Sequence, residues 1–192
     1  PPSVKYRGIF INDEDWGLHP WARDNYSPED EYIGPKAYAR VFELLLRLKA
    51  NYIWPAMHLC TKGFYTFPEN KHVADDYAIV VGSSHCEQML RNNEWEWRRY
   101  TKPDGEKPGD WDWCTNSDTI IEYWRHRVEY TAGFEGMYTL GMRGIHDSGM
   151  PCNGADNHQK MLAMQNEIFP AQRKMLNDHN KAMLMIGPIF CP

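Results

Sequence analysis

The chain has 192 residues, which is enough for one domain with a sizeable core, and its composition (42% hydrophobic, 24% charged) is typical of a globular protein. A net charge of −5 gives no basic field that would attract nucleic acid or an anionic membrane, and no apolar run approaches the ~18 residues of a membrane span. Eight tryptophans and eleven tyrosines are compatible with a sugar-binding cleft, because the flat apolar faces of sugars stack on aromatic rings.

The cysteines form no C-x-x-C pair, which argues against a zinc ribbon and a thioredoxin-like redox motif. Disulfides are possible, but the spacing does not fix their pairing. The chain has no initiating methionine and no signal peptide, and both ends look like cuts in a longer protein. We therefore expect residues 1–192 to be one piece of a larger protein. The cysteines are Cys60, Cys86, Cys114, Cys152 and Cys191.

Apolar runs and helical patterns alternate along the first half of the chain. Residues 7–12 predict a short buried strand, and residues 51–57 and 77–82 predict two more. Between the first two, residues 34–50 predict a helix with one apolar face. Residues 68–76 are a shorter helical candidate. The apolar face of the longer helix consists of Tyr38, Val41, Phe42, Leu45 and Leu48.

The same alternation continues in the second half. Strands are predicted over residues 137–144 and 182–186. Strands that alternate with helices indicate an α/β fold with a parallel sheet, and near-continuous apolar strands are expected when both sheet faces are covered. Helices are predicted over residues 87–97, 116–133 and 157–178, the last interrupted at Pro170.

Polar side chains directly follow each of the first four predicted strands. In a parallel α/β fold the carboxyl ends of all strands lie on one side, and that side holds the active site. We therefore expect four clusters, distant in sequence, to converge in space. They are Asn12, Asp13, Glu14, Asp15 and Trp16; Met57 and His58; Ser83, Ser84, His85 and Glu87; and Arg143, His146, Asp147 and Ser148.

Each cluster also has a simple structural interpretation. The acids at 13–15 would suit a solvated loop or a helix cap, and His85 and Glu87 would suit hydrogen bonds to the backbone. Arg143 would suit a structural ion pair. The position of four clusters at strand ends, rather than any one cluster, favours an active site. The remaining histidines are interpreted as surface or packing residues: His19, His72, His126, His158 and His179.

Two chemistries fit such a site. Glycoside hydrolysis needs two carboxyl groups, one as acid for the leaving oxygen and one as base or nucleophile, and Arg143 would hold an anionic substrate group. The candidate carboxyls are Asp13, Glu14, Asp15, Glu87 and Asp147. Metal-assisted hydrolysis is the alternative, although no H-x-H or HExxH spacing is present. Its ligands would be His58, His85, Glu87, His146 and Asp147.

Four long motifs, which occur in the right order, resemble glycoside hydrolase family 115, the xylan α-1,2-glucuronidases. They are YRGIFINDEDWGL, PKAYARVFELLLRLKANYIWPAM, ENKHVADDYAIVVGSSHCEQMLR and GFEGMYTLGMRGIHDSGMP. The similarity runs from about Tyr6 to Met175, which is most of the chain.

The resemblance implies a (β/α)8 TIM-barrel catalytic domain, of which residues 1–192 would supply only about the first half, four to five βα units. It implies an inverting glycosidase that removes glucuronic acid, or its 4-O-methyl form, from xylan branches, with no metal and no organic cofactor. The implied substrates are glucuronoxylan or aldouronic oligosaccharides. A homodimer is one expectation for the parent enzyme, and secretion or a periplasmic location is expected because the polymer is large.

The family's active-site groups fall at strand ends, and Arg143 suits the glucuronate carboxylate. The acid and the base are not assigned among the carboxyls. The catalytic candidates are Asp13, Glu14, Asp15 and Asp147. Because side chains alternate along a strand, Asp13 and Asp15 would share one direction and Glu14 the other. The substrate-binding candidates are Trp16, Trp54, His58, His85, Glu87, Arg143 and His146.

The chain departs from the family's pattern at several positions. His58 stands where an aromatic residue is frequent, Cys86 where a second histidine is frequent, and Ile145 and His146 stand where many members carry acids. The family continues into a fifth strand with a glutamate thought to be catalytic, whereas this chain departs after about Met175. We therefore predict that the 192-residue piece is inactive and marginally folded by itself. A non-catalytic carbohydrate-binding half barrel is the remaining alternative.

Overall fold

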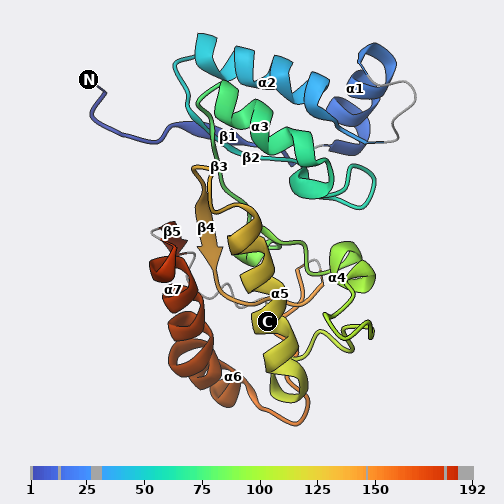
Figure 1. The fold of residues 1–192 in the computed structure, drawn as a ribbon, viewed down its shortest axis with the longest axis vertical. Coiled ribbons are helices and arrows are strands. Elements are labelled where there is room, and N and C mark those ends of the chain that lie inside the picture. Colours follow the sequence, from blue (N-terminus) through green and yellow to red (C-terminus); the bar gives the residue numbers. More distant parts are fainter. Residues whose placement is uncertain (1, 13, 27–31, 146, 180, 186–192) are drawn as a thin grey trace. The chain divides into compact units, whose positions relative to one another are not determined.

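A computed structural model describes residues 2–12, 14–26, 32–145, 147–179 and 181–185 of the chain (Figure 1). The chain divides into two compact units. Unit 1 comprises Pro1–Gly82 with Phe134–Gly136, and unit 2 comprises Ser83–Gly133 with Met137–Pro192. Every pair of neighbouring strands in the described residues is parallel, as the sequence predicts for an α/β fold.

The sheet of unit 1 has three strands in the order β1 (Gly8–Phe10), β2 (Tyr52–Trp54) and β3 (Val80–Val81). All three lie where the sequence predicts strands. Gly8 is required in β1, because a Cβ at this position would lie only 1.8 Å from the carbonyl oxygen of Tyr52. The close approach of β1 to β2 is therefore possible only because glycine has no side chain at this position.

Two helices of unit 1, α2 (Pro35–Arg47) and α3 (Pro68–Asp76), lie side by side along the sheet (Figure 1). Each begins with a proline in its first turn, a position that needs no N–H donor. The predicted apolar face of α2 is buried from Tyr38 to Leu45 and packs with Ile53 of β2. Leu48 was assigned to this face wrongly: it lies after the end of α2 and is 66% exposed.

Both helices end in a Schellman motif whose left-handed residue is not glycine. After α2, Lys49 has φ 62°, and Ala50 N–H donates to the carbonyl of Leu45 at 2.8 Å. After α3, Ala78 has φ 52°, and the N–H of Ile79 donates to the carbonyl of Ala74 at 2.9 Å. These turns feed the chain directly into β2 and β3, at a steric cost that glycine would avoid.

Replacing Lys49 or Ala78 with glycine should therefore raise the free energy of unfolding by about 0.5–1 kcal/mol, because glycine adopts a positive φ without a clash at Cβ. Urea denaturation measures this change. Ala39, inside α2, is the matched control, where the same substitution should lower stability by about 0.5–1 kcal/mol. A Lys49→Gly protein that is less stable than the wild type would show that the turn does not carry this cost.

The segment after β1 differs from its prediction. A polar loop was expected, but the chain forms a π-helical turn (Glu14–Leu18) followed by α1 (His19–Asn25). The strand ends at Phe10, so Glu14 and Asp15 do not alternate as residues of a strand would. Asp13 lies outside the described residues, so the expectation that Asp13 and Asp15 share one direction stays a prediction. Asp15 lies in a helical turn, where the period is near four rather than two.

Unit 2 is built on β4 (Met137–Leu140), which pairs with β5 (Ala182–Met185) along its full length. Both strands occur where the sequence predicts them. The long helix α5 (Trp113–Tyr130) packs against α7 (Phe169–Asp178), which also packs against both strands (Figure 1). The shorter α6 (Asn157–Ala163) precedes α7.

The predicted helix over 157–178 is nearly continuous. A π-helical segment (Met164–Ile168) joins α6 to α7, so the interruption predicted at Pro170 is a local widening just before the proline. Asp156 and Gln159 form a capping box at the start of α6. The helix over 116–133 in fact begins at Trp113, because Asp112 is its N-cap.

The helix predicted over residues 87–97 is mostly absent. The chain forms a single 3-10 turn (Gln88–Leu90), in which Met89 and Leu90 both have positive φ, and α4 spans only Trp95–Arg99. Asn92 stops the helix from starting earlier, because its Oδ1 accepts hydrogen bonds from the N–H groups of Glu94 at 3.0 Å and Trp95 at 3.2 Å. Asparagine competes with helical hydrogen bonds in this way.

An ion cluster joins α4 to α5 in the interior of unit 2. Arg91 donates from Nε to Oε1 of Glu96 at 3.1 Å, and Arg127 donates to the same oxygen. Arg91 also lies over the ring of Tyr123, 3.7 Å from its centroid. Two arginines share one glutamate, so aromatic faces and backbone carbonyls supply their remaining partners.

A disulfide joins Cys114, in the first turn of α5, to Cys152, in the segment between β4 and α6. The sequence left this pairing open. Asp112 reinforces the junction, because its Oδ1 accepts from the N–H of Thr115 and its Oδ2 from the N–H of Asn153 at 2.8 Å.

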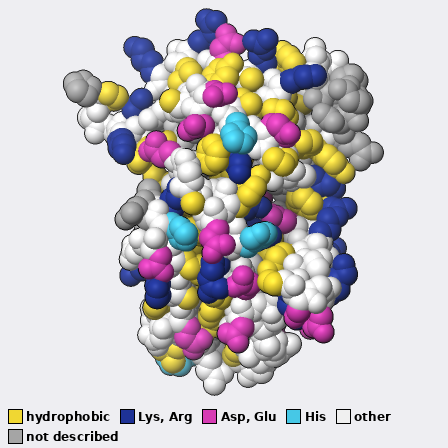
Figure 2. All heavy atoms as spheres, viewed as in Figure 1, with side chains coloured by type: hydrophobic (Ala, Val, Ile, Leu, Met, Phe, Trp, Pro, Cys, Tyr) yellow, Lys and Arg dark blue, Asp and Glu magenta, His cyan; other side chains and the backbone are white. Residues whose placement is uncertain are grey.

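The face drawn in Figure 2 gives no sign of a binding surface of a single charge. On the face drawn in Figure 2, acidic and basic side chains are interspersed. Within the described parts of the chain, no helix is both long and apolar enough to cross a bilayer.

Candidate active site

The segments that follow β3 and β4 meet within unit 2. Thr139 in β4 donates its hydroxyl to the carbonyl of Ser83 at 2.5 Å, which ties the two strand ends together. After β4, Gly144 begins a tight loop that closes through its N–H to the carbonyl of Ser148 at 3.2 Å. A Cβ at Gly144 would lie 2.5 Å from the carbonyl oxygen of Gly149, so only glycine fits there. The loop presents Asp147 to the segment after β3.

Two predicted site residues, His85 and Arg143, both contact a third, Asp147. Nε2 of His85 lies 3.0 Å from Oδ1 of Asp147, and Nη2 of Arg143 lies 3.2 Å from the same oxygen. The two donors therefore converge on one carboxylate oxygen. Asp147 is 78% exposed, whereas the Arg143 side chain is only 9% exposed.

Arg143 is a buried cation with little compensation. Its Nε is buried and has no hydrogen-bond partner among the described residues. Its ion-pair partner, Asp147, is largely solvated. A buried guanidinium needs an anion, and its planar fork matches a carboxylate with two hydrogen bonds. An anionic group bound beside Arg143 would therefore supply a partner that the described residues do not.

Glu87 lies beside this cluster as a buried carboxyl. It is 5% exposed, and Nδ2 of Asn92 donates to its Oε1 at 3.4 Å. The turn that carries it is closed by the hydroxyl of Ser83, which donates to the Glu87 carbonyl at 2.5 Å. A buried carboxyl group in this position is suited to accept hydrogen bonds from a bound ligand.

Burial raises the pKa of the Cys86 thiol to about 11, a shift that Asp147 and Glu87 reinforce and Arg143 opposes. Cys86, His85 and Asp147 place donor atoms within 4.8 Å of one another. This set suits a cation poorly, because the guanidinium of Arg143 already contacts the same carboxylate. The alternative metal set of the sequence interpretation also placed Glu87 and His58 as ligands, and neither belongs to this group.

Alkylation of Cys86 by iodoacetamide should be slow at pH 7–8 and should accelerate as the pH rises toward 11, because only the thiolate reacts. Mass spectrometry of the peptide that contains Cys86, in the Cys60→Ser background, measures the rate. Cys60 is the other free cysteine of the described residues. Rapid labelling at pH 7 would contradict burial of this thiol.

The site candidates of unit 1 have varied surroundings. Cys60 donates its thiol to Oδ1 of Asp15, so the segments after β1 and β2 also meet. Trp16 is 84% exposed. Trp54 donates its indole N–H to the Tyr52 hydroxyl at 2.5 Å, which makes it partly a packing residue.

His58 starts a turn, in which its carbonyl accepts from the N–H groups of Thr61 and Lys62 at 3.1 and 2.8 Å. Asp13 and His146 lie outside the described residues, as does the side chain of Glu14. The convergence of all four clusters stays a prediction. The structure brings together the third with the fourth, and it joins Asp15 of the first to Cys60, two residues after His58.

A basic hollow lies beside α1 in unit 1, near the ends of β1 and β2. It was not predicted, because His19 was interpreted as a surface or packing residue. Lys62 has φ 61° and places Nζ 4.5 Å from the centroid of the Tyr32 ring. The hollow is lined by His19, Arg23, Tyr32, Leu59, Cys60 and Lys62.

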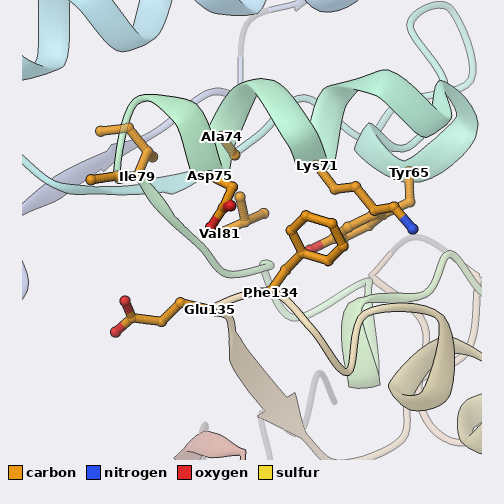
Figure 3. Close-up of a pocket in the computed structure, with 9 residues that line it drawn as sticks. Tyr65, Lys71, Ala74, Asp75, Ile79, Val81, Phe134 and Glu135 are labelled. Carbon is orange, nitrogen blue, oxygen red and sulfur yellow. The ribbon is translucent and has the colours of Figure 1, made fainter.

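A second hollow of unit 1 lies at the opposite ends of the strands. Phe134 lies below α3, and Lys71 and Asp75 extend from that helix (Figure 3). Residues 78–79 and 134–135 line it just before β3 and β4, that is, at the amino ends of the strands. Active sites of parallel α/β folds lie at the carboxyl ends, so we do not assign this hollow to the substrate.

Several residues that shape the site carried no functional prediction. Asn92 and Asn93 were interpreted as part of a helix, and Gln172 as one more position of the last helix. Asn93, Gln172 and Trp111 all hydrogen-bond the backbone around Arg143. A consecutive Asn pair in a predicted helix is the one signal in the sequence that could have indicated a break there.

The geometry defines an α/β protein whose strand ends gather an arginine, a histidine and carboxyls. The model of glycosyl hydrolase family 115 matches residues 1–191, and the chain belongs to this family. No curated protein matches the chain.

A solved structure described as a novel family GH115 4-O-methyl-α-glucuronidase, with specificity for decorated arabinogalactans, is similar to the chain. It shares 43% sequence identity and has a TM-score of 0.84 over 95% of this chain. The chain spans 24% of the length of that structure's chain.

Proposed function

We propose that the whole protein is an α-glucuronidase that removes α-1,2-linked glucuronic acid, or its 4-O-methyl form, from glucuronoxylan. The observation that carries the proposal is Arg143, a buried guanidinium with an unpartnered Nε and an exposed ion-pair partner. Among glycosides, an anion at this position is the feature that distinguishes a uronic acid from a neutral sugar. Family membership and the name of the similar structure support this substrate class.

We further propose an inverting mechanism with two carboxyl groups. One protonates the leaving oxygen, and the other activates a water on the opposite face of the sugar. The carboxyls proposed for these roles are Asp13, Glu14, Asp15 and Asp147, with Glu87 beside them as a buried substrate contact. His85 would orient Asp147, because Nε2 contacts its Oδ1. No metal or organic cofactor takes part in the proposed reaction.

We propose that the chain folds as about the first half of a TIM barrel within a larger, multidomain enzyme. The 24% coverage of the similar structure supports this proposal, and so does the sheet of unit 1. All three residues of its edge strand β1 are exposed, with Ile9 at 46% and Phe10 at 37%. An exposed apolar edge strand is suited to pair with a further strand.

The identity of the polymer that carries the glucuronic acid is the next question. The resemblance implies xylan, whereas the similar structure is described as specific for decorated arabinogalactans. Arg143 would recognise the same terminal sugar in either polymer, and other contacts would distinguish the backbones. The disulfide supports an oxidising compartment such as the periplasm or the cell exterior, where such polymers are degraded.

The test is release of uronic acid by the whole protein from glucuronoxylan, aldouronic oligosaccharides and decorated arabinogalactan, followed by proton NMR. We expect release from the first two, with the β anomer appearing first because the mechanism inverts. The isolated 192-residue chain should release none. Release from arabinogalactan alone would replace xylan as the substrate, and binding without release from any polymer would favour the non-catalytic alternative.

A further inference from the structure

Two buried amide side chains hold the backbone on either side of Arg143. Asn93, which is 2% exposed, donates from Nδ2 to the carbonyl oxygens of Arg143 at 3.0 Å and Gly144 at 2.8 Å. Gln172 in α7 is fully buried. Its Oε1 accepts from the N–H of Gly141 at 2.8 Å, and its Nε2 donates to the Gly141 carbonyl at 2.6 Å. The two amides thus bracket the residue that would bind the substrate carboxylate.

Among the described residues, no strand pairs with this stretch of backbone. β4 ends at Leu140, and Gly141 has φ 136°, a conformation that side chains with a Cβ rarely adopt. Gln172 supplies this backbone with two hydrogen bonds, both to Gly141. Trp111 adds a further bond, because its indole N–H donates to the Arg143 carbonyl at 2.6 Å. The carbonyl of Arg143 accepts two hydrogen bonds, both from buried side chains.

Asn93 is itself firmly placed. The preceding Arg91 is held by Glu96 and by the carbonyl of Tyr123, and Asn92 caps the turn that leads into α4. The left-handed pair before this segment turns the chain inward, so that Asn93 points at the loop after β4 rather than lying on a helix. The strained backbone at Met89 and Leu90 thus helps to hold the loop after β4 in place.

We infer that Asn93 and Gln172 are positioning residues for carboxylate recognition: they set the direction of the Arg143 guanidinium by fixing its backbone. The inference rests on the proposed function, in which Arg143 binds the uronic acid. A planar fork gains its second hydrogen bond only when it is correctly oriented, and a shift of about 1 Å is enough to lose much of the benefit. Loss of either amide should therefore weaken binding of the charged sugar more than binding of a neutral copy.

The test compares D-glucuronic acid with D-glucuronamide, which has the same shape without the charge. Calorimetry on the whole protein gives the ratio of their dissociation constants. We expect wild type to prefer the acid, Arg143→Ala to abolish the preference, and Asn93→Ala and Gln172→Ala each to reduce it about tenfold, the equivalent of one charge-assisted hydrogen bond. Trp111→Phe, which removes a single donor and retains an aromatic ring, should reduce it less and serves if the alanine variants do not fold.

Asn70 supplies the matched control. It is a fully buried amide in unit 1, and its Nδ2 donates to the Phe64 carbonyl at 2.8 Å, so Asn70→Ala should cost stability without changing the ratio. If Asn93→Ala and Trp111→Phe keep the wild-type ratio while Arg143→Ala abolishes it, the positioning inference is wrong and the proposed function stands. If wild type does not prefer the acid, both fall.

Discussion

Arg143→Ala in the whole protein should lower kcat/KM for release of glucuronic acid by roughly 30-fold or more, because removal of a buried, hydrogen-bonded charge that faces a carboxylate costs about 2–5 kcal/mol. The Arg143 side chain is 9% exposed, so the carboxylate would be desolvated where they meet. Its contact with the exposed Asp147 offers little competition, since ion pairs with a solvated partner contribute about 0–1 kcal/mol.

Two further variants sharpen this result. Arg143→Lys keeps the charge but loses the fork, so we expect an intermediate activity. Arg98→Ala removes an arginine whose side chain is 65% exposed and pairs with Glu94, and this change should leave kcat/KM unchanged. Steady-state kinetics on aldouronic oligosaccharides measures all three. If Arg143→Ala keeps kcat/KM within about threefold of wild type, the carboxylate binds elsewhere.

The double substitution Cys114→Ala with Cys152→Ala should lower the free energy of unfolding of unit 2 by about 4 kcal/mol. The disulfide closes a loop with a sequence separation of 38. On the chain-entropy model, closing a loop of this size lowers the entropy of the unfolded state and so stabilises the folded state by about 4 kcal/mol. The loop contains most of α5 and all of β4, the strand that carries Arg143 at its end. On heating, the variant without the disulfide should therefore lose activity at a lower temperature than the wild type.

Urea denaturation followed by tryptophan fluorescence measures this loss. Trp113 and Trp124 of α5 report on unit 2, and replacing Trp16, Trp21 and Trp54 with phenylalanine would remove the signal of unit 1. Cys60→Ala is the control, because Cys60 is a free cysteine of unit 1, and the change should cost far less. A loss below about 1 kcal/mol in the double variant would mean that the unfolded chain is already compact around this junction.

The sequence was sufficient to predict all five strands and the two helices of unit 1 that cover the sheet. Their signals are local: an apolar run bounded by Gly or Pro, and an apolar face that repeats every three to four residues. It failed where a side chain outcompetes the helix. Asn92 caps a later start than the pattern suggested, and Asp112 caps an earlier one. Such competition depends on where each side chain can reach, which the pattern of residue types does not contain.

The candidate site was predictable in outline only. His85, Arg143 and Asp147 could be found because they follow strands, and strand ends share a side in parallel folds. Asn93 and Gln172 could not, because they act through backbone carbonyls and N–H groups that any residue offers. The sequence pattern also did not predict the helical turn after β1, because Asp15 and its neighbours are equally typical of a loop.

The most direct test of the central claim is a crystal structure of the whole protein with glucuronic acid bound. We predict that the sugar carboxylate lies within hydrogen-bond distance of the Arg143 guanidinium, with Asp147 displaced from Nη2 or sharing the arginine with the ligand. Glucuronic acid bound at another position, with the Arg143–Asp147 contact unchanged, would contradict the account.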